Sequence, residues 1–215
     1  LVFDLDDTLY PEIHYVRSGF RVIAAHLAAP GRDVDSIFQL LCQAFESGPR
    51  DRVFNTVLPK LGLSDDPQLI AELVSLYRTH RPALQLDNST RRLLADLKKN
   101  YTLGLLTDGY LPAQPLKVEA LQLQKYIPHI LYTEELGRQF WKPSTVPFEK
   151  MTQLLRCPQA QTVYIADNPA KDFLAPRQLG WFTVRLHHPG QLHSNLTPAP
   201  DALPHFTIPS LTDLP

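Results

Sequence analysis

The chain opens with LVFDLDDTL (residues 1–9), in which three apolar residues lead directly into a cluster of carboxylates. Its first five residues have the composition of a short buried strand, and Asp4 and Asp6 lie where that strand ends. An aspartate that continues a buried apolar run needs a partner or a role, because burying an unpaired charge is costly. We therefore interpret Asp4 as functional, and Asp7 and Thr8 as residues that shape the following turn.

The spacing of the first two carboxylates points to a metal. Two residues apart on an extended chain, Asp4 and Asp6 point to the same side and repel each other unless a cation or a shared proton lies between them. Mg²⁺ takes a few carboxylate or carbonyl oxygens at roughly 2.0–2.1 Å and completes its shell with water and substrate phosphate. The opening motif therefore predicts a Mg²⁺ site.

Beyond this motif, short apolar runs alternate with helical patterns. The further strand patterns are 102–106, 130–132, 162–166 and 182–186, and the helical patterns are 88–98, 116–123, 147–155 and 172–179. Alternation of this kind predicts an α/β fold with a parallel sheet. Asn88 or Ser89 is the expected N-cap of the first of these helices, and Gly180 ends the last.

The stretch from about residue 11 to residue 81 contains no convincing strand. Apolar residues recur there at three- and four-residue steps, and segments with proline and glycine separate the runs. The pattern predicts three or four amphipathic helices inserted after the first strand. We expect residues 12–81 to form a helical cap that acts as a lid, and residues 1–11 and 82–215 to form the core.

Bulk composition excludes several classes of protein. The 215-residue chain is 44% apolar, which is ordinary for a globular protein of one or two domains. Its formal net charge of −1 provides no basic field, so we expect neither nucleic acid nor a membrane surface as a partner. No apolar run approaches the ~20 residues that cross a bilayer. Cys42 and Cys157 are too few for a disulfide framework, which favours a cytoplasmic location.

Three further features lie near the ends of the sequence. Leu1 lies inside the first strand pattern, so we expect the natural start of the protein to precede it. From Pro189 the chain is rich in proline, with an apolar patch at 206–208 that predicts one edge strand. Asn195 begins a match to the N-glycosylation pattern, which we interpret as chance.

Two later segments place groups suited to phosphate near the same sheet edge. Thr107 and Asp108 follow the strand pattern at 102–106, where a hydroxyl and neighbouring backbone N–H groups can hold phosphate oxygens. Lys142 precedes a proline that restricts its backbone, and its charge can offset that of a phosphoryl group.

The fourth motif supplies another acid at a strand end. Asp167 follows the strand pattern at 162–166, and Asp172 lies five residues further on. The carboxyl ends of parallel strands line the ligand crevice, so Asp167 suits a metal ligand and Asp172 a residue that supports it. Alternatively, Asp172 is an N-terminal helix charge favoured by the helix dipole. We interpret Lys171 as a structural partner of one of these acids.

The order of these four motifs resembles the haloacid dehalogenase-like superfamily, in its branch with a helical cap inserted after the first motif. The resemblance spans nearly the whole chain. It implies a Rossmann-like, doubly wound parallel sheet with the cap as an insertion. It also implies Mg²⁺-dependent hydrolysis of a small phosphorylated metabolite.

The resemblance further implies catalytic roles. Asp4 would attack phosphorus, and Asp6 would protonate the leaving group and later activate water. Thr107, Asp108 and Lys142 would bind the phosphoryl group.

The metal site implied by the resemblance uses the first and fourth motifs. Mg²⁺ would lie on the carboxylates of Asp4 and Asp167 and on the backbone carbonyl of Asp6. Asn168 and Asp172 would support these ligands.

Three alternatives remain open from the sequence. A sugar-phosphate mutase would use the same residues but return the phosphoryl group to its substrate. A dehalogenase needs no acid at the position of Asp6, and is disfavoured for that reason. A non-catalytic scaffold domain would have no need to retain all the motif side chains.

The sequence does not select a substrate. His14, Arg17 and Arg21 on the first expected cap helix are the polar candidates for substrate contacts, although each also suits a solvated helix face. A nucleoside monophosphate, a sugar or sialic-acid phosphate, and phosphoglycolate all suit this branch by analogy.

Overall fold

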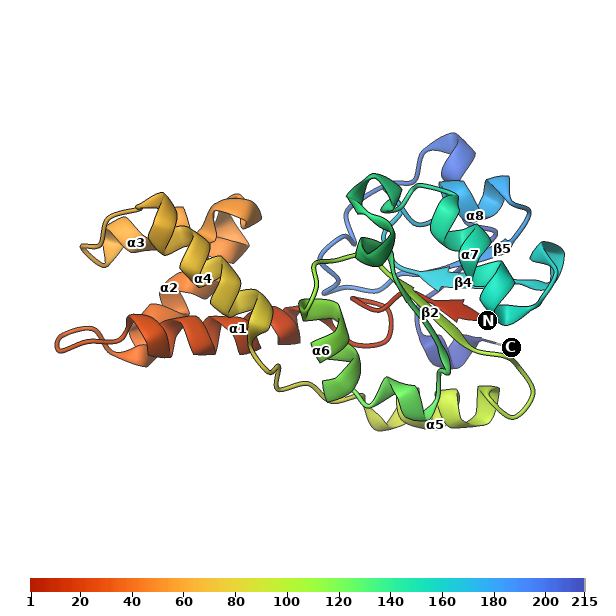
Figure 1. Cartoon of the computed structure of the whole chain (residues 1–215), viewed down its shortest axis with the longest axis horizontal. Coiled ribbons are helices and arrows are strands. Elements are labelled where there is room, and N and C mark those ends of the chain that lie inside the picture. Colours follow the sequence, from red (N-terminus) through yellow and green to blue (C-terminus); the bar gives the residue numbers. More distant parts are fainter. Residues whose placement is uncertain (215) are drawn as a thin grey trace. The chain divides into compact units, whose positions relative to one another are not determined.

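The computed structural model describes residues 1–214 and divides into two compact units. Leu1–Ile13 and the chain from Gln85 onward form the first, here called the sheet unit, and His14–Leu84 form the second, the helical unit. Figure 1 shows that the strands belong to the sheet unit.

The sheet unit is built on parallel strands. They are β1 (Val2–Phe3), β2 (Gly104–Thr107), β3 (His129–Tyr132), β4 (Val163–Ala166), β5 (Phe182–Leu186) and β6 (Phe206–Ile208). Within residues 1–214 they form one six-stranded sheet in the order β3-β2-β1-β4-β5-β6. The order reverses at β1, which is where open α/β sheets form their ligand crevice. The prediction of an α/β fold on a Rossmann-like parallel sheet is confirmed.

The register of β1 brings three motif-bearing segments side by side. Phe3 pairs with Leu105 of β2 and with Ile165 of β4. The Asp4 N–H continues the ladder by donating to the Ile165 carbonyl at 2.9 Å. The chain therefore leaves β1 at Asp4, between the carboxyl ends of β2 and β4.

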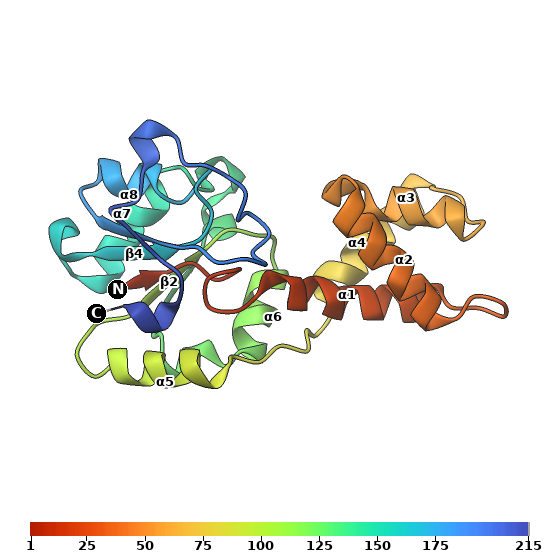
Figure 2. The same ribbon diagram turned by 180° about the vertical axis from the view of Figure 1, so that it is seen from behind.

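Helices cover both faces of the sheet. They are α5 (Asn88–Leu97), α6 (Ala113–Ala120), α7 (Val146–Leu155) and α8 (Leu174–Gln178). Figures 1 and 2 show α5 and α6 on one face and α7 and α8 on the other. Short 3₁₀ turns connect the elements: η2 (Leu123–Lys125), η3 (Thr133–Leu136), η4 (Arg138–Phe140), η5 (Gln159–Gln161), η6 (Pro200–Ala202) and η7 (Leu211–Asp213).

The core beneath α7 is aromatic and tightly packed. The Phe148 ring meets the rings of Tyr164 and Trp181 edge to face, with centroids 5.1 and 5.5 Å apart. Gly104 allows α7 to approach β2, because a Cβ at this position would lie 2.9 Å from the Met151 sulfur. Close packing of this kind makes the face sensitive to changes in side-chain volume.

The helical unit consists of amphipathic helices. Its elements are α1 (Glu12–Leu27), which begins in the sheet unit, then α2 (Val34–Ser47), η1 (Arg50–Arg52), α3 (Val53–Lys60) and α4 (Pro67–Thr79). Their apolar faces meet in a core that includes Ile23, Leu41 and Leu73, all fully buried. The inserted helices predicted from the apolar spacing are present.

Three details of the helices differ from the sequence prediction. The N-cap of α5 is Asp87, not Asn88 or Ser89, because its carboxylate accepts the Thr90 N–H at 2.7 Å. α6 begins three residues earlier than expected, since its buried face carries polar residues that break the apolar spacing. α8 has only five residues and starts after Asp172.

The C-terminal segment also contributes to the sheet. The apolar patch at 206–208 forms β6, which pairs with β5 as the expected edge strand. Among the helices of residues 1–214, none combines the length and hydropathy needed to span a bilayer.

Truncating the aromatic core should lower the stability of the protein. We expect Phe148→Ala to lower the free energy of unfolding by about 3–5 kcal/mol, because it leaves a cavity between Tyr164 and Trp181. Denaturant unfolding followed by tryptophan fluorescence measures this loss. The matched control is Phe206→Ala on the edge strand, where the side chain is 61% exposed and the expected loss is below about 1 kcal/mol. Equal losses in the two variants would contradict this packing.

Candidate active site

A polar cavity of about 110 Å³ lies at the carboxyl ends of β1 and β4. It is lined by Asp4, Asp6, Glu12, Asp108, Asp167, Asn168, Lys171 and His193. The structure thus brings together the acids of the first and fourth motifs, which are separated by more than 150 residues in the chain. Thr107, Lys142 and Asp172 are buried next to this set and are not part of the lining.

Lys142 joins the nucleophile candidate to the fourth motif. Its Nζ donates to Asp4 Oδ1 and to Asp172 Oδ1, both at 2.6 Å, and to the Tyr164 hydroxyl at 2.9 Å. The Lys142 side chain is fully buried. A lysine ammonium has three N–H donors, so all three are used within the protein.

Burial and charge shift the pKa values of this cluster. Burial raises the pKa of Asp4 to about 6, with Asp172 adding to the rise and Lys142 opposing it. Burial alone would lower the pKa of Lys142, but the carboxylates of Asp172 and Asp4 raise it well above its ordinary value. Lys142 is therefore a fixed cation at neutral pH.

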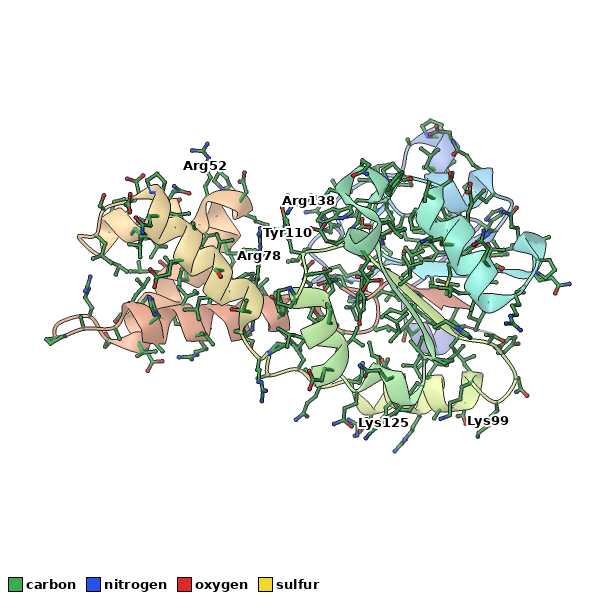
Figure 3. All side chains as sticks on the ribbon, in the orientation of Figure 1. Arg52, Arg78, Lys99, Tyr110, Lys125 and Arg138 are labelled. Carbon is green, nitrogen blue, oxygen red and sulfur yellow. The ribbon has the colours of Figure 1, made fainter. Side chains whose placement is uncertain are left out.

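Contacts among neighbouring side chains hold the segment that carries Lys142. Figure 3 shows Tyr110 and Arg138 beside each other, and the Arg138 guanidinium lies 4.4 Å from the Tyr110 ring centre. Tyr110 also meets Trp141 edge to face, and the Trp141 indole donates to Glu134 at 3.0 Å. These contacts fix the residue that immediately precedes Lys142.

Asp167 is the acid best suited to a metal. Its Oδ1 accepts a long hydrogen bond of 3.4 Å from Thr8, and its buried Oδ2 has no partner among the described residues. Burial, followed by the charges of Asp172 and Asp4, raises the pKa of Asp167 to about 9. Oxygens of Asp4, Asp167 and Asp172 lie within 4.8 Å of one another. The hard carboxylate oxygens of Asp4 and Asp167 fit Mg²⁺.

Asp172 supports the site rather than facing the cavity. Its Oδ1 accepts from Lys142 and Tyr164, and its Oδ2 accepts the Asn168 N–H at 3.0 Å. Asp172 lies directly before Phe173, the N-cap of α8, and is therefore outside the helix, which starts at Leu174. The Asn168 side chain accepts the Ala170 N–H at 3.0 Å and so shapes the same turn.

Asp6 is held by three side chains. Lys117 Nζ donates to both Asp6 oxygens at 2.8 and 2.9 Å, Gln114 donates to Oδ2 at 3.0 Å, and the Tyr10 hydroxyl donates to Oδ1. Burial raises the pKa of Asp6, but Lys117 and these hydrogen bonds outweigh that effect and lower it. Asp6 is therefore ionised at neutral pH in the absence of substrate.

The second motif lies against Asp6 and Lys142. The Thr107 hydroxyl accepts from Gln114 at 2.7 Å, while the Asp108 carboxylate accepts from Thr133 at 2.7 Å and from the Lys142 N–H at 3.3 Å. The Asp108 side chain is thus engaged within the protein. Phosphate binding at Asp108 remains a prediction for its backbone N–H alone.

Two expectations on other residues can be compared with their surroundings. Asp7 shapes the turn, since its carboxylate accepts the N–H groups of Glu12 and Leu192. Arg21 on α1, one of the residues considered for substrate contacts, forms an ion pair with Asp35 of the helical unit.

Several residues of the site were not anticipated from the sequence. They are Tyr10, Glu12, Gln114, Lys117, Tyr164 and His193. Burial and the charge of Asp6 raise the pKa of Glu12 to about 7. Gln114 and Lys117 are three residues apart and lie on one helix face. This spacing could have identified them as a pair if the sequence had predicted the start of α6.

Known proteins similar to this chain include hydrolases and phosphatases. The model of the family described as haloacid dehalogenase-like hydrolase matches residues 1–186. A glyceraldehyde 3-phosphate phosphatase of Methanopyrus kandleri is 24% identical, over 97% of this chain and 91% of that protein. An N-acylneuraminate-9-phosphatase of Rattus norvegicus is 28% identical, over 72% of this chain and 60% of that protein.

Solved structures share the fold. The HAD-hydrolase YfnB of Bacillus subtilis, solved with bound magnesium, superposes with a TM-score of 0.67 at 22% identity, over 99% of this chain and 95% of that one. The L-2-haloacid dehalogenase of Xanthobacter autotrophicus gives 0.62 at 19% identity, over 99% and 95%. With the family match covering most of the sequence and the motifs assembled at one sheet edge, this chain belongs to the haloacid dehalogenase-like hydrolases.

Proposed function

We propose that the protein hydrolyses small phosphate monoesters in a Mg²⁺-dependent reaction, through an aspartyl phosphate on Asp4. One observation carries this proposal: Asp4 is bonded to a buried lysine, and it lies beside Asp6 and the unpartnered oxygen of Asp167. Similar proteins that are named as phosphatases support the same reaction class. The acid at Asp6 favours phosphorus chemistry over displacement of halide from carbon, which needs no acid there.

The first step transfers the phosphoryl group to the protein. A carboxylate oxygen of Asp4 bonds to phosphorus, the bond between phosphorus and the ester oxygen breaks, and that oxygen takes a proton from Asp6. Lys142 keeps its charge next to Asp4 throughout and offsets the charge of the phosphoryl oxygens. Thr107 and the backbone N–H groups of its turn hold those oxygens in place.

Asp6 has to acquire the proton that it donates, because its pKa is lowered in the free protein. A phosphoryl group next to Asp6 brings negative charge, and a like charge raises the pKa of a carboxyl group. Phosphate monoesters have a second pKa of about 6, so part of the substrate arrives with a proton of its own. Substrate binding thus favours the acid form of Asp6.

The second step returns the protein to its starting state. Asp6, ionised by the first step, takes a proton from water as the water oxygen bonds to phosphorus. The bond between phosphorus and Asp4 breaks, and inorganic phosphate leaves. The same carboxylate serves as acid and then as base.

The metal would be held by Asp4 and Asp167, with the carbonyl of Asp6. When bound, Mg²⁺ supplies positive charge that stabilises the phosphoryl oxygens during transfer. Asp172 has both oxygens occupied by hydrogen bonds, so we assign it the task of holding Lys142 and the turn after β4.

The named relatives guide the choice of substrates. Glyceraldehyde 3-phosphate and N-acylneuraminate 9-phosphate are phosphate esters on a hydroxylated carbon chain. We propose this class as the first to test, with nucleoside monophosphates and phosphoglycolate as further members of the panel.

Turnover should require both Asp4 and the metal. We expect phosphate release from at least one panel member with Mg²⁺, loss of activity with EDTA, and recovery when Mg²⁺ is restored. Asp4→Asn should lower kcat by at least about 10³-fold, because an amide cannot form the aspartyl phosphate. A phosphate-release assay measures both effects.

The matched control is Asp201→Asn, an exposed aspartate on η6 that should leave activity unchanged. Retained turnover in Asp4→Asn would contradict the proposal. Accumulation of a bisphosphate in place of free phosphate would identify a mutase.

Stabilisation by Mg²⁺ should increase with pH. Asp4 and Asp167 have pKa values raised to about 6 and about 9, so the metal-free folded protein binds more protons than the unfolded chain. Its stability therefore falls as pH rises from about 4 towards about 9. Mg²⁺ needs ionised carboxylates and competes with these protons. We expect the rise in Tm on adding Mg²⁺ to be larger at about pH 8.5 than at about pH 6.

Thermal unfolding in Mg²⁺ and in EDTA at both pH values provides the measurement. Asp167→Asn removes the residue with the larger shift and should reduce the difference, leaving only the contribution of Asp4. A Tm increase that is equal or smaller at the higher pH would rule out competition between Mg²⁺ and these protons.

A further inference from the structure

Helix α6 presents two buried polar side chains to Asp6. Gln114 and Lys117 are 1% and 4% exposed, although a helix that covers a sheet usually buries apolar residues. Their spacing of three residues places them on the same helix face. Both reach the same carboxylate, Lys117 at 2.8 and 2.9 Å and Gln114 at 3.0 Å.

Gln114 connects the ends of two strands. Its Nε2 also lies 2.7 Å from the Thr107 hydroxyl and 2.9 Å from the Asp108 carbonyl. The two N–H hydrogens are thus shared among three acceptors, which come from the loop after β1 and from the end of β2. A single amide therefore fixes Asp6 relative to the second motif.

The backbone of the second motif packs closely against the side-chain amide of Gln114. Gly109 has a φ of +145°, and a Cβ there would lie 2.7–2.8 Å from carbon atoms of the Gln114 side chain. A residue with a side chain would therefore displace Gln114. The turn after β2 and the glutamine of α6 form one packed arrangement.

Stability alone does not account for the buried lysine. A buried ion pair adds little net stability, since the cost of removing both charges from water offsets their attraction. The pair here is nearly closed to water, with the Lys117 and Asp6 side chains 5% and 17% exposed. What the contacts do provide is a fixed orientation, because Asp6 Oδ1 accepts from Lys117 and Tyr10 and Oδ2 from Lys117 and Gln114.

We propose that Gln114 and Lys117 are positioning residues, which hold the Asp6 carboxylate in the orientation from which it exchanges protons during phosphoryl transfer. This inference rests on the proposed function, in which Asp6 is the acid and then the base. In the first step the Asp6 proton goes to the ester oxygen as its bond to phosphorus breaks and the bond from Asp4 forms. In the second step Asp6 takes a proton from water.

The identity of the leaving group distinguishes positioning from a general structural role. An alkoxide is strongly basic and leaves only if it is protonated, whereas 4-nitrophenolate is weakly basic and leaves without a proton. The quantity kcat/KM covers the reaction up to transfer of the phosphoryl group to Asp4. A misplaced Asp6 therefore lowers kcat/KM for an alkyl phosphate much more than for 4-nitrophenyl phosphate.

The experiment compares Lys117→Met and Gln114→Met with the wild-type protein on two substrates. The substrates are 4-nitrophenyl phosphate and glyceraldehyde 3-phosphate, or in place of the latter the alkyl phosphate that the wild-type protein hydrolyses fastest. General acid catalysis contributes about 10²–10⁴-fold, so we expect kcat/KM for the alkyl ester to fall about 10- to 100-fold further than for the aryl ester. Lys117→Arg retains donors to Asp6 and should recover part of the loss.

The matched surface control is Lys99→Met. Lys99 is 67% exposed, and Figure 3 shows it across the sheet unit from Tyr110 and Arg138, so both substrates should be turned over as by the wild-type protein. If Lys117→Met does not fold, as judged by its thermal unfolding, Gln114→Met carries the comparison.

Asp6→Asn in the same assay separates this inference from the proposed function. Selective loss on the alkyl ester in Asp6→Asn, with unchanged or equal losses on both esters in Lys117→Met and Gln114→Met, would overturn the positioning role alone. Absence of selective loss in Asp6→Asn would overturn the acid role of Asp6, and the positioning role with it.

Discussion

Buried negative charge at the ends of β1 and β4 is the constraint around which the sheet unit is organised. Oxygens of Asp4, Asp167 and Asp172 lie within 4.8 Å of one another, and carboxylates this close cannot all be ionised without a cation. Lys142 is a cation that the chain itself provides, and it bonds to two of the three. Burial, followed by the charges of Asp172 and Asp4, raises the pKa of Asp167, and Lys142 opposes that rise only in part.

The pairing of an aspartate with a buried lysine occurs twice at the site. Two aspartates of the first motif are each paired with a buried lysine, Asp4 with Lys142 and Asp6 with Lys117, and the two lysines come from different crossover segments. Buried ion pairs of this kind add little to net stability, so their value lies in fixing charge and orientation. The sheet brings the acids together, and the segments after β2 and β3 deliver the counter-ions.

The strands and their carboxyl ends could be predicted from the sequence, because they depend on local patterns of apolar and acidic residues. An apolar run that ends in an acid marks a strand and its carboxyl end, which is why Asp4 and Asp167 could be placed at strand ends without coordinates. Gln114 and Lys117 could not, because polar residues on a buried helix face interrupt the periodicity that identifies that face. The hydrogen-bond partners of Asp172 depend on chain segments far apart in sequence, so only the folded structure reveals them.

The position of β1 within the sheet also determines when the protein can assemble. Val2 pairs with Gly104 on one side and with Tyr164 on the other, so β1 is synthesised long before it can acquire both of its neighbours. The helical unit, whose contacts are contiguous in sequence, is synthesised in full before either partner strand exists. Pairing across such long separations is slow, and unpaired strands are prone to aggregation until it is complete. Completion of the sheet is therefore a late event in biosynthesis, and β1 lacks its second neighbour until β4 has been made.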